Sequence, residues 1–520
     1  MKKIYTFLLF TIAFLNVNAQ FTGIQWQKAL GGSATDIAKA VQQTTDGGYI
    51  VAGYTQSNDG DVTFNHGNSD YWVVKLDATG TIQWQKTYGG SDYEEATSIQ
   101  QTTDGGSIVA GLSESNDGDV TGHHLGFANS DYWVVKLDAS GTLQWEKSLG
   151  GDDQERAYSI YQTNDGGYVV AGWAYSFNGD VTGHHGVPGD YWVVKLDSSG
   201  IIQWQKSLGG SDNDIASSVS QTTDGGYIVA GGAGSTDGDV TGNHFRDYWV
   251  VKLDNVGGLQ WEKCYGGSSV DGANSIQQTT DGGYIVGGGS ASTDGEVTGN
   301  HNSFDYWVVK IDSSGTLQWE KSLGGSYNEN CTSIHQTTDG GYIVAGGTPS
   351  NDGDVTGFHG TAMTTNDCWI VKLNSSGTII WEEALGGSGN DGASCIQQTS
   401  DGGYIMAGGA NSNDGDVTGN HGGGDCWIVK LSQYTGVEEN TFDNQVGIYP
   451  NPSNGVFTVE TNGIVGTTIS VIDIVGKVVI IHRTLGSNNV IINMSDVEKG
   501  IYIVQMQTEK GNENRKIIIE

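Results

Sequence analysis

The chain has 520 residues and a formal net charge of −36, with a pI of about 4.3. Nucleic acid and anionic membrane surfaces repel such a polyanion, so neither is an expected partner. The length is sufficient for two or more domains. Five cysteines in 520 residues do not make a disulfide scaffold, so we expect mostly buried free thiols, with one bridge left open, at Cys264, Cys331, Cys368, Cys395 and Cys426.

The N-terminus has the organisation of a secretory signal peptide. Lys2 and Lys3 precede an apolar run over 4–15, and small residues precede an expected cleavage between Ala19 and Gln20. The run is too short to span a membrane comfortably. We therefore expect residues 1–19 to be removed during export, and no transmembrane segment in the mature chain.

Seven copies of one unit follow, and tryptophan marks them. Trp26 and Trp84 are 58 residues apart, and later steps are similar. The first series is Trp26, Trp84, Trp145, Trp204, Trp261, Trp319 and Trp381. The second series is Trp72, Trp133, Trp192, Trp249, Trp307, Trp369 and Trp427. Self-similarity at a fixed period indicates a repeat architecture.

Each unit contains four short runs with strand character, such as IQWQKSL, SIQQT, YIVAG and YWVVKL, separated by turns rich in Gly, Asp and Ser. Four strands cannot bury a face alone, so the units must pack together. We predict an all-β, seven-bladed β-propeller over 20–431. A β-helix is the alternative, although its repeats are normally shorter. If 24–30 is an outer strand, it completes the last blade by pairing with the sheet formed by 394–431.

The repeats also resemble a family of secreted bacterial β-propeller repeats, through the elements LGGS, TDGGYIVAG and DYWVVKLD. The resemblance covers about 24–431. It implies the fold, but no activity, because the family is known mainly as a repeat.

Residues that recur in all seven units are expected to be structural. Fourteen exposed tryptophans would promote aggregation, so both series are predicted to fill the gaps between blades. An Asp that opens the DYW strand (Asp70 in the first unit) and a Lys five residues later (Lys75) form a second recurring set. We expect these charges to tie blade edges to loops. Trp173 lies outside both series and is a candidate for ligand stacking, although packing is favoured.

The Asp-Gly-Asp loops are the candidate metal sites, because two carboxylates at i and i+2 suit Ca²⁺. Calcium is the only cofactor that they suggest. The alternative interpretation, which we favour, is a turn shaped by Asp side chains and a glycine with positive φ. A His follows each loop, but one His per blade does not make a zinc site. The calcium candidates are Asp59, Asp61, Asp117, Asp119, Asp180, Asp237, Asp239, Asp294, Glu296, Asp352, Asp354, Asp414 and Asp416.

Alternate connections between strands are expected on opposite faces of the propeller. If the strand order is right, TDGG and DSSG turns share one face. The LGGS loops and the Asp-Gly-Asp loops share the other, which is the best candidate for a ligand surface. No catalytic residues can be nominated, because Ser, His and Asp recur in every unit.

After a polar linker over 432–444, short alternating runs predict a small Ig-like β-sandwich over 445–520. This module closely resembles the C-terminal sorting domain of type IX (Por) secretion cargo, through YPNPSNG, IDIVGK, KGIYIVQM and the terminal RKIIIE. The resemblance implies export across the outer membrane, followed by release or attachment to surface lipopolysaccharide. A plain carbohydrate-binding sandwich is the alternative. The motif positions are Pro450, Asn451, Pro452, Gly455, Gly476, Lys477, Gly500 and Tyr502.

The sequence thus indicates an exported extracellular or cell-surface propeller that acts as a binding or adhesion scaffold. The expected partners are the type IX machinery and a glycan or protein ligand. The alternative is a secreted hydrolase acting on polysaccharide. An enzyme should have one asymmetric pocket built from residues that break the repeat, for which Arg156, Trp173, Arg246 and His335 are candidates.

Overall fold

The computed structural model describes residues 23–124, 129–433, 447–460, 468–473, 477–483, 489–508 and 511–520. Every regular element in these ranges is a β-strand. The chain divides into two compact units, Met1–Thr435 and Gly436–Glu520. The predicted signal peptide and most of the predicted linker lie outside the described residues.

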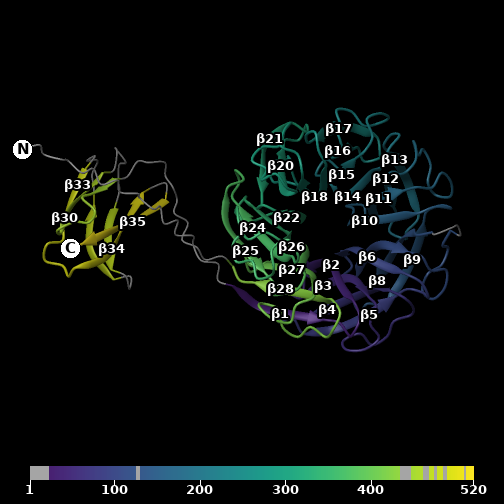
Figure 1. The fold of residues 1–520 in the computed structure, drawn as a ribbon, viewed down its shortest axis with the longest axis horizontal. Coiled ribbons are helices and arrows are strands. Elements are labelled where there is room, and N and C mark those ends of the chain that lie inside the picture. Colours follow the sequence, from purple (N-terminus) through teal and green to yellow (C-terminus); the bar gives the residue numbers. More distant parts are fainter. Residues whose placement is uncertain are drawn as a thin grey trace, which may run out of the picture. The chain divides into compact units, whose positions relative to one another are not determined.

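The first unit contains seven four-stranded antiparallel sheets arranged as the blades of a propeller (Figure 1). Blade 1 comprises β2 (Asp36–Gln43), β3 (Tyr49–Thr55), β4 (Asp70–Leu76) and β5 (Ile82–Tyr88). Blade 2 comprises β6 (Glu94–Gln101), β7 (Ser107–Ser113), β8 (Asp131–Leu137) and β9 (Leu143–Leu149). Blade 3 comprises β10 (Glu155–Gln162), β11 (Tyr168–Ala174), β12 (Asp190–Leu196) and β13 (Ile202–Leu208). Blade 4 comprises β14 (Asp214–Gln221), β15 (Tyr227–Ala233), β16 (Asp247–Leu253) and β17 (Leu259–Tyr265).

Blade 5 comprises β18 (Asp271–Gln278), β19 (Tyr284–Ser290), β20 (Asp305–Ile311) and β21 (Leu317–Leu323). Blade 6 comprises β22 (Asn330–Gln336), β23 (Tyr342–Thr348), β24 (Asp367–Leu373) and β25 (Ile379–Leu385). Blade 7 comprises β26 (Asp391–Gln398), β27 (Tyr404–Ala410), β28 (Asp425–Leu431) and β1 (Ile24–Leu30). The all-β, seven-bladed prediction is confirmed.

The ring is closed by the first strand of the chain. β1 pairs antiparallel with β28, with Lys28 opposite Ile428, so the purple and green ends of the ribbon meet in one sheet (Figure 1). Across this seam Trp427 Nε1 donates a hydrogen bond to Gln27 Oε1 at 3.0 Å. The predicted pairing of 24–30 with the last blade is therefore confirmed, and blade 7 has the same four strands as the others.

Buried aromatic side chains join each blade to the next. The second tryptophan series is 0–1% exposed. Between blades 2 and 3, the rings of Tyr132 and Trp192 lie 4.6 Å apart, and the Tyr132 hydroxyl donates to the Trp192 carbonyl at 2.9 Å. The phenol thus satisfies a buried polar group while its ring fills the space between the sheets.

The first tryptophan series also lies between blades, but on the outer strands, where it is half-buried except for Trp381. Trp145 packs against Tyr168 of the next blade with ring centroids 5.8 Å apart. Its ring also covers Gly200, which has a φ of +80° and would place a Cβ 2.9 Å from the indole. Glycine is required at this position of the DSSG turn, because the backbone has a positive φ and because the indole ring leaves no room for a Cβ.

The recurring Asp and Lys of the third strand do not pair with each other, because they lie at opposite ends of it. Lys136 is 3% exposed, and its Nζ lies 2.9 Å from Asp104 Oδ2 in the TDGG turn. Burial of Asp104 raises its pKa, but hydrogen bonds from Thr102, Lys136 and the Gly106 amide outweigh this effect, and the pKa falls to about 2. The expected structural role is confirmed, with the lysine tying the third strand to the turn between the first two.

The second unit consists of two small antiparallel sheets around one apolar core. The first sheet has the order β29 (Gly447–Tyr449), β30 (Val456–Glu460) and β33 (Asn489–Asn493). The second has the order β32 (Val478–Arg483), β31 (Thr468–Asp473), β34 (Gly500–Thr508) and β35 (Gly511–Ile519). Phe457, Val471 and Val504 are buried in the core between the sheets.

The aromatic contacts between blades predict a large effect of Trp133→Ala. We expect the free energy of unfolding to fall by about 3–5 kcal/mol, because a fully buried indole leaves a cavity between two sheets. Trp173→Ala should cost less, since this side chain is half-buried. Urea denaturation followed by circular dichroism measures both. Equal small losses would contradict the role assigned to the second series.

Candidate functional site

The first strand of each blade lines a central channel. These strands, such as β10, have a register irregularity after their third residue, between Ala157 and Ser159 in blade 3. Strand positions are counted as in β10, because β22 of blade 6 begins one residue later than the other inner strands. The irregularity shifts the alternation of side chains, so that the second, fourth and seventh residues of the strand face the channel. One repeated strand therefore supplies three rings of channel-lining side chains.

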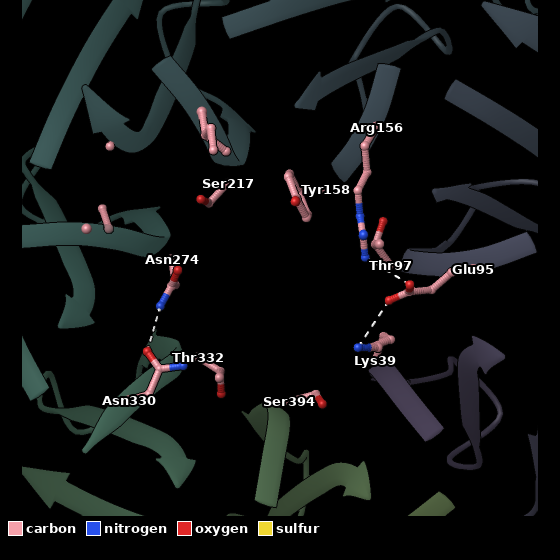
Figure 2. A pocket seen from close by; sticks show the side chains of 14 residues that line it. Lys39, Glu95, Thr97, Arg156, Tyr158, Ser217, Asn274, Asn330, Thr332 and Ser394 are labelled. Carbon is pink, nitrogen blue, oxygen red and sulfur yellow. Dashed lines mark hydrogen bonds and ion pairs between the residues drawn. The ribbon is translucent and has the colours of Figure 1, made fainter. Parts of the chain in front are cut away.

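The channel opens at the face that carries the LGGS and Asp-Gly-Asp loops, which we call the long-loop face. At this end, which we call the channel mouth, lies a cavity of about 510 Å³ (Figure 2). At the other end, a cavity of about 290 Å³ is lined by the ring of seventh residues, among them Tyr161 and His335. Burial lowers the pKa of His335 to about 4, so its imidazole is neutral at pH 7.

Three charged residues that break the repeat meet in the channel mouth. Glu95 Oε1 lies 3.1 Å from Lys39 Nζ, and Glu95 Oε2 lies 2.9 Å from Arg156 Nη2. Figure 2 shows Glu95 between the two cations, each of which comes from a neighbouring blade. Burial raises the pKa of Glu95, but the two positive charges outweigh this effect and hold the pKa below its usual value. Glu95 is therefore ionised at neutral pH.

Aromatic side chains surround this cluster. The Arg156 guanidinium lies 5.2 Å from the centroid of the Tyr158 ring, and Lys39 Nζ lies 5.6 Å from that of Tyr54. The Tyr158 hydroxyl accepts a hydrogen bond from Trp173 Nε1 at 3.3 Å. Trp173 is thus placed beside the channel mouth. The buried Nε of Arg156 has no hydrogen-bond partner among the described residues.

The opposite wall of the channel mouth is uncharged. It consists mainly of hydroxyl and amide side chains, and Asn274 Nδ2 lies 3.3 Å from Asn330 Oδ1 (Figure 2). Of the four repeat-breaking residues considered from sequence, Arg156 lines the channel mouth and His335 lies deeper. Arg246 is exposed in a long loop and does not line either cavity.

Sequence reasoning missed Lys39, Glu95, Tyr158 and Asn330. The signal was present, because a residue-by-residue comparison of the seven inner strands shows these types at positions where other units have Ile, Gly, Ser or Thr. What the sequence did not show is that the second and fourth strand positions share one cavity.

The Asp-Gly-Asp loops hold the LGGS loops in place. In the first repeat, Asp59 Oδ1 accepts the Ser33 amide at 2.7 Å, and Asp61 Oδ2 accepts the Gly31 amide at 3.2 Å. The same two bonds recur in each repeat, with Asn178 and Glu296 as variants. Gly60 has a φ of +65°, and a Cβ there would lie 2.3 Å from the Gly31 carbonyl oxygen. The LGGS loops and the Asp-Gly-Asp loops therefore share one face, as predicted.

The histidines that follow these loops bind the recurring aspartate of the third strand. His66 Nδ1 lies 2.5 Å from Asp70 Oδ2, and its Nε2 lies 4.0 Å from Asp119 in the next blade. Within the described ranges, no group of three His, Cys, Asp or Glu side chains is arranged to hold a metal ion. Calcium binding at the Asp-Gly-Asp loops stays a prediction, and their hydrogen bonds fit the turn interpretation.

A buried pair of carboxyl groups lies at the junction between successive blades. Glu155 of blade 3 and Asp131 of blade 2 are both fully buried. A Cβ on Gly150 would lie 2.3 Å from Glu155 Oε2 and 2.7 Å from Asp131 Oδ1, so both oxygens crowd one point. Asp131 Oδ1 has no hydrogen-bond partner among the described residues. Burial is the main reason that the pKa of Glu155 rises to about 7.

In the second unit, the described sorting-motif positions lie in turns or near the start of β34. Asn451, between Pro450 and Pro452, donates from Nδ2 to the Lys516 carbonyl at 2.7 Å and accepts the Ile518 amide at 3.0 Å. The amide of Lys477 donates to Asp473, while Gly455 has a φ of +104° and Gly500 opens β34. The Tyr502 hydroxyl donates to the Glu498 carbonyl at 2.6 Å. Gly476 lies outside the described residues.

The protein is thus a seven-bladed β-propeller joined to a small β module. Residues 447–520 match the family model described as "Secretion system C-terminal sorting domain". This segment is therefore a sorting domain of the type IX (Por) system, which indicates export to the cell surface or the medium. The structure contains no helix, in the ranges it describes, that is long and apolar enough to cross a membrane.

Two curated relatives are similar to parts of the chain. "Regulatory protein FlaEY" of Caulobacter vibrioides is 23% identical over 417 residues, which cover 71% of this chain and 42% of the relative. "Endo-acting ulvan lyase" of Formosa agariphila is 25% identical over 185 residues, which cover 35% of this chain and 31% of the relative. The chain thus spans less than half the length of either relative.

Among solved structures, PorZ, a surface component of the type IX secretion system of Porphyromonas gingivalis, matches with 12% identity and a TM-score of 0.41. The match covers 95% of this chain and 60% of PorZ.

The buried carboxyl pairs predict that stability falls as pH rises from about 5 to 8. Glu155 and Glu329 have pKa values raised from 4.5 to about 7 in the folded protein, mainly by burial. The folded state therefore holds protons that the unfolded state has lost, and this contribution disappears as pH passes the folded pKa. Each residue contributes at most about 3 kcal/mol, since one pKa unit corresponds to about 1.4 kcal/mol.

The measurement is the melting temperature between pH 5 and 8 for the wild type and for Glu155→Gln/Glu329→Gln. The double variant should show a shallower decline with pH, whereas Asp152→Asn, at an exposed position, should keep the wild-type slope. A double variant with the wild-type slope would contradict the assignment.

The loop contacts predict that EDTA leaves the melting temperature of the full chain unchanged, because the Asp-Gly-Asp carboxylates already accept backbone N–H groups. Differential scanning fluorimetry with EDTA and with added CaCl₂, together with metal analysis, tests this. Bound calcium near one ion per blade and a lower melting temperature in EDTA would establish metal loops instead.

Proposed function

We propose that this protein is an exported extracellular binding protein whose ligand occupies the channel mouth on the long-loop face. The observation that carries the proposal is the cavity of about 510 Å³ in which the sevenfold repeat is broken by Lys39, Glu95, Arg156 and Tyr158. Residues needed only for blade packing recur in every unit. A concave site with a few convergent polar groups is the usual form of a ligand site.

The chemistry of the channel mouth suits a polar ligand. Lys39 and Arg156 offer hydrogen-bond donors, and Glu95 offers acceptors. Because Glu95 contacts both cations, the cluster binds without bringing a large net charge to the ligand. The ligand is a glycan or a protein segment, and binding or adhesion at the cell surface is the role that follows.

The route of export forms part of the proposal. Residues 1–19 act as a signal peptide for passage into the periplasm, and the type IX machinery then recognises the sorting domain, 445–520. The propeller, 20–431, is released or attached to surface lipopolysaccharide, with 432–444 as the linker. The family match at 447–520 supports this route.

A second candidate is an enzyme acting on polysaccharide. The asymmetry of the channel mouth favours it, and one relative is described as an endo-acting ulvan lyase. However, Glu95 is the one carboxylate among the described residues that line this cavity, and two ion pairs hold it. Acid–base catalysis by a pair of carboxyl groups, as in most glycoside hydrolases, has no counterpart there. The site therefore supports binding better than hydrolysis.

The proposal predicts that Arg156→Ala weakens ligand binding by about tenfold or more, since charged anchors in the centre of a site contribute over 1 kcal/mol. The measurement is binding of the labelled full chain to an array of neutral glycans, acidic glycans and peptides, followed by titration of the best ligand. Arg246→Ala removes an arginine from the same face outside the cavity and should bind like the wild type.

Binding that is unaffected by Arg156→Ala, or absent from the whole array, would contradict the proposal. Release of oligosaccharides from the bound polymer would establish the enzymatic alternative.

A further inference from the structure

Blades 1–3 and blades 5–7 differ in the side chains beside the channel mouth, and this difference extends the channel mouth outward. The second residue of each inner strand is opposite the sixth residue of the next strand, as with Arg156 and Trp173 in blade 3. In blades 1–3 both members of this pair are larger than alanine: Ile37 and Tyr54, Glu95 and Leu112, Arg156 and Trp173. In blades 5–7 they are Gly272 and Gly289, Asn330 and Gly347, Gly392 and Gly409.

The missing side chains leave open space at three of these positions. A Cβ on Gly272 or Gly392 would meet no atom within 4 Å, and one on Gly347 would meet only a carbonyl oxygen at 3.8 Å. Two other glycines differ, because Phe304 covers Gly289 and Ile37 covers Gly409. None of the three open glycines has a positive φ, so neither backbone conformation nor packing requires glycine there.

Two of these glycines, Gly347 and Gly392, line a second cavity between blades 6 and 7. It has a volume of about 370 Å³ and shares Asn330, Thr332 and Ser394 with the cavity of the channel mouth. The two cavities are therefore neighbours, and we call them together the polar trough. It runs from the Lys39–Glu95–Arg156 cluster outward over the inner strands of blades 6 and 7.

The outer part of the polar trough is lined by amides. Its walls include Asn328, Asn330, Asn366, Asn390 and Asn411. Asn390 Oδ1 accepts the Asn366 amide at 3.1 Å, and Asn328 Oδ1 accepts the Ser303 hydroxyl at 2.7 Å, which hold these side chains in place. Among the described residues that line this cavity there is no Lys or Arg, and Asp391 is buried beneath the surface.

We propose that the ligand of this protein is an extended, neutral oligosaccharide that lies along the polar trough; this inference rests on the proposed function. An amide both donates and accepts hydrogen bonds without charge, which matches sugar hydroxyl groups. A polyanionic chain would be repelled by a protein with a net charge of −36 and would find no cations in the outer trough. One end of the chain contacts the Arg156 guanidinium, which lines the channel mouth beside the ring of Tyr158.

The glycines make a sharp test available, because the blades themselves show which side chains the fold accepts. Gly392→Ile and Gly272→Ile copy Ile37 and Ile215, the residues at the same position in blades 1 and 4. The substitutions should therefore fold and fill the trough. Thr280→Ile adds the same side chain to an exposed turn on the opposite face and is the matched control.

The experiment is isothermal titration of the full chain with linear neutral oligosaccharides of two to six sugars: cello-, laminari-, manno- and xylo-oligosaccharides. For at least one series, affinity should increase with chain length. Gly392→Ile should weaken binding of the hexasaccharide by about tenfold or more and leave binding of the disaccharide nearly unchanged. Thr280→Ile should bind both like the wild type, and equal melting temperatures confirm that all variants fold.

Two results would overturn the inference. One is the absence of binding to every neutral series. The other is hexasaccharide binding that Gly392→Ile and Gly272→Ile do not weaken. If the array finds an acidic glycan or a peptide whose binding depends on Arg156 but not on these glycines, the proposed function stands and the neutral trough ligand is wrong. If binding of no ligand depends on Arg156, both the proposed function and the neutral trough ligand are wrong.

Discussion

The contact between successive blades, in which a buried tryptophan and at most junctions a tyrosine close the space between two sheets, is the interaction on which the remaining structure depends. A single blade exposes two apolar faces and has no core of its own. Tyr132 fills the gap to blade 3 with its ring and satisfies the Trp192 carbonyl with its hydroxyl. Burying one such indole removes about 150–250 Å² from water, which corresponds to roughly 4–6 kcal/mol as an upper value. The tyrosine and the tryptophan form this contact at the five junctions from blade 1 to blade 6, and Cys368 and Cys426 stand in place of the tyrosine at the two junctions of blade 7. An open ring would leave the apolar faces of its end blades in water, so the ring is stable only when it closes. This explains why the first strand of the chain completes the last blade, with Trp427 bonded to Gln27 across the seam.

The polar loops of the long-loop face depend on the same geometry. The junctions bring the start of each inner strand beside the third strand of the preceding blade, so Glu155 and Asp131 meet where little water can reach them. Removing a carboxylate from water is costly, and the raised pKa of Glu155 reflects mainly this burial, to which the neighbouring Asp131 adds a smaller effect. The Asp-Gly-Asp carboxylates, by contrast, are exposed at the first position and half-buried at the second, and they accept backbone amides from the LGGS loop. Acidic residues that look equivalent in the sequence thus have different roles because burial differs between them.

Much of this fold could be predicted from the sequence, because the residues that blade packing requires recur in all seven units. The spacing of Trp26 and Trp84 gives the repeat length, and the order of runs within one unit gives the strand order. The same regularity limited the prediction of the site. Asp70 and Lys75 recur together, yet they lie at opposite ends of one strand and bind different loops. The cavity depends on which single copies deviate, and on the irregularity that turns Tyr158 into the channel beside Arg156. Neither the register nor the sharing of one cavity by several blades can be read from one unit.

Sevenfold packing also explains how the inner strands can vary. The junction residues hold the blades at their aromatic layers, so the second residue of an inner strand carries little of the stability and can be Ile, Glu, Arg, Asn or Gly. In blades 2 and 3 this position carries Glu95 and Arg156, which belong to the charged cluster. In blades 5 and 7 the same position is glycine and leaves open space, since nothing lies within 4 Å of a Cβ on Gly272 or Gly392. A rigid ring can bear such losses because the neighbouring sheets do not collapse into the gap. In this protein, absent side chains are therefore as informative about the ligand as the charged residues that face them.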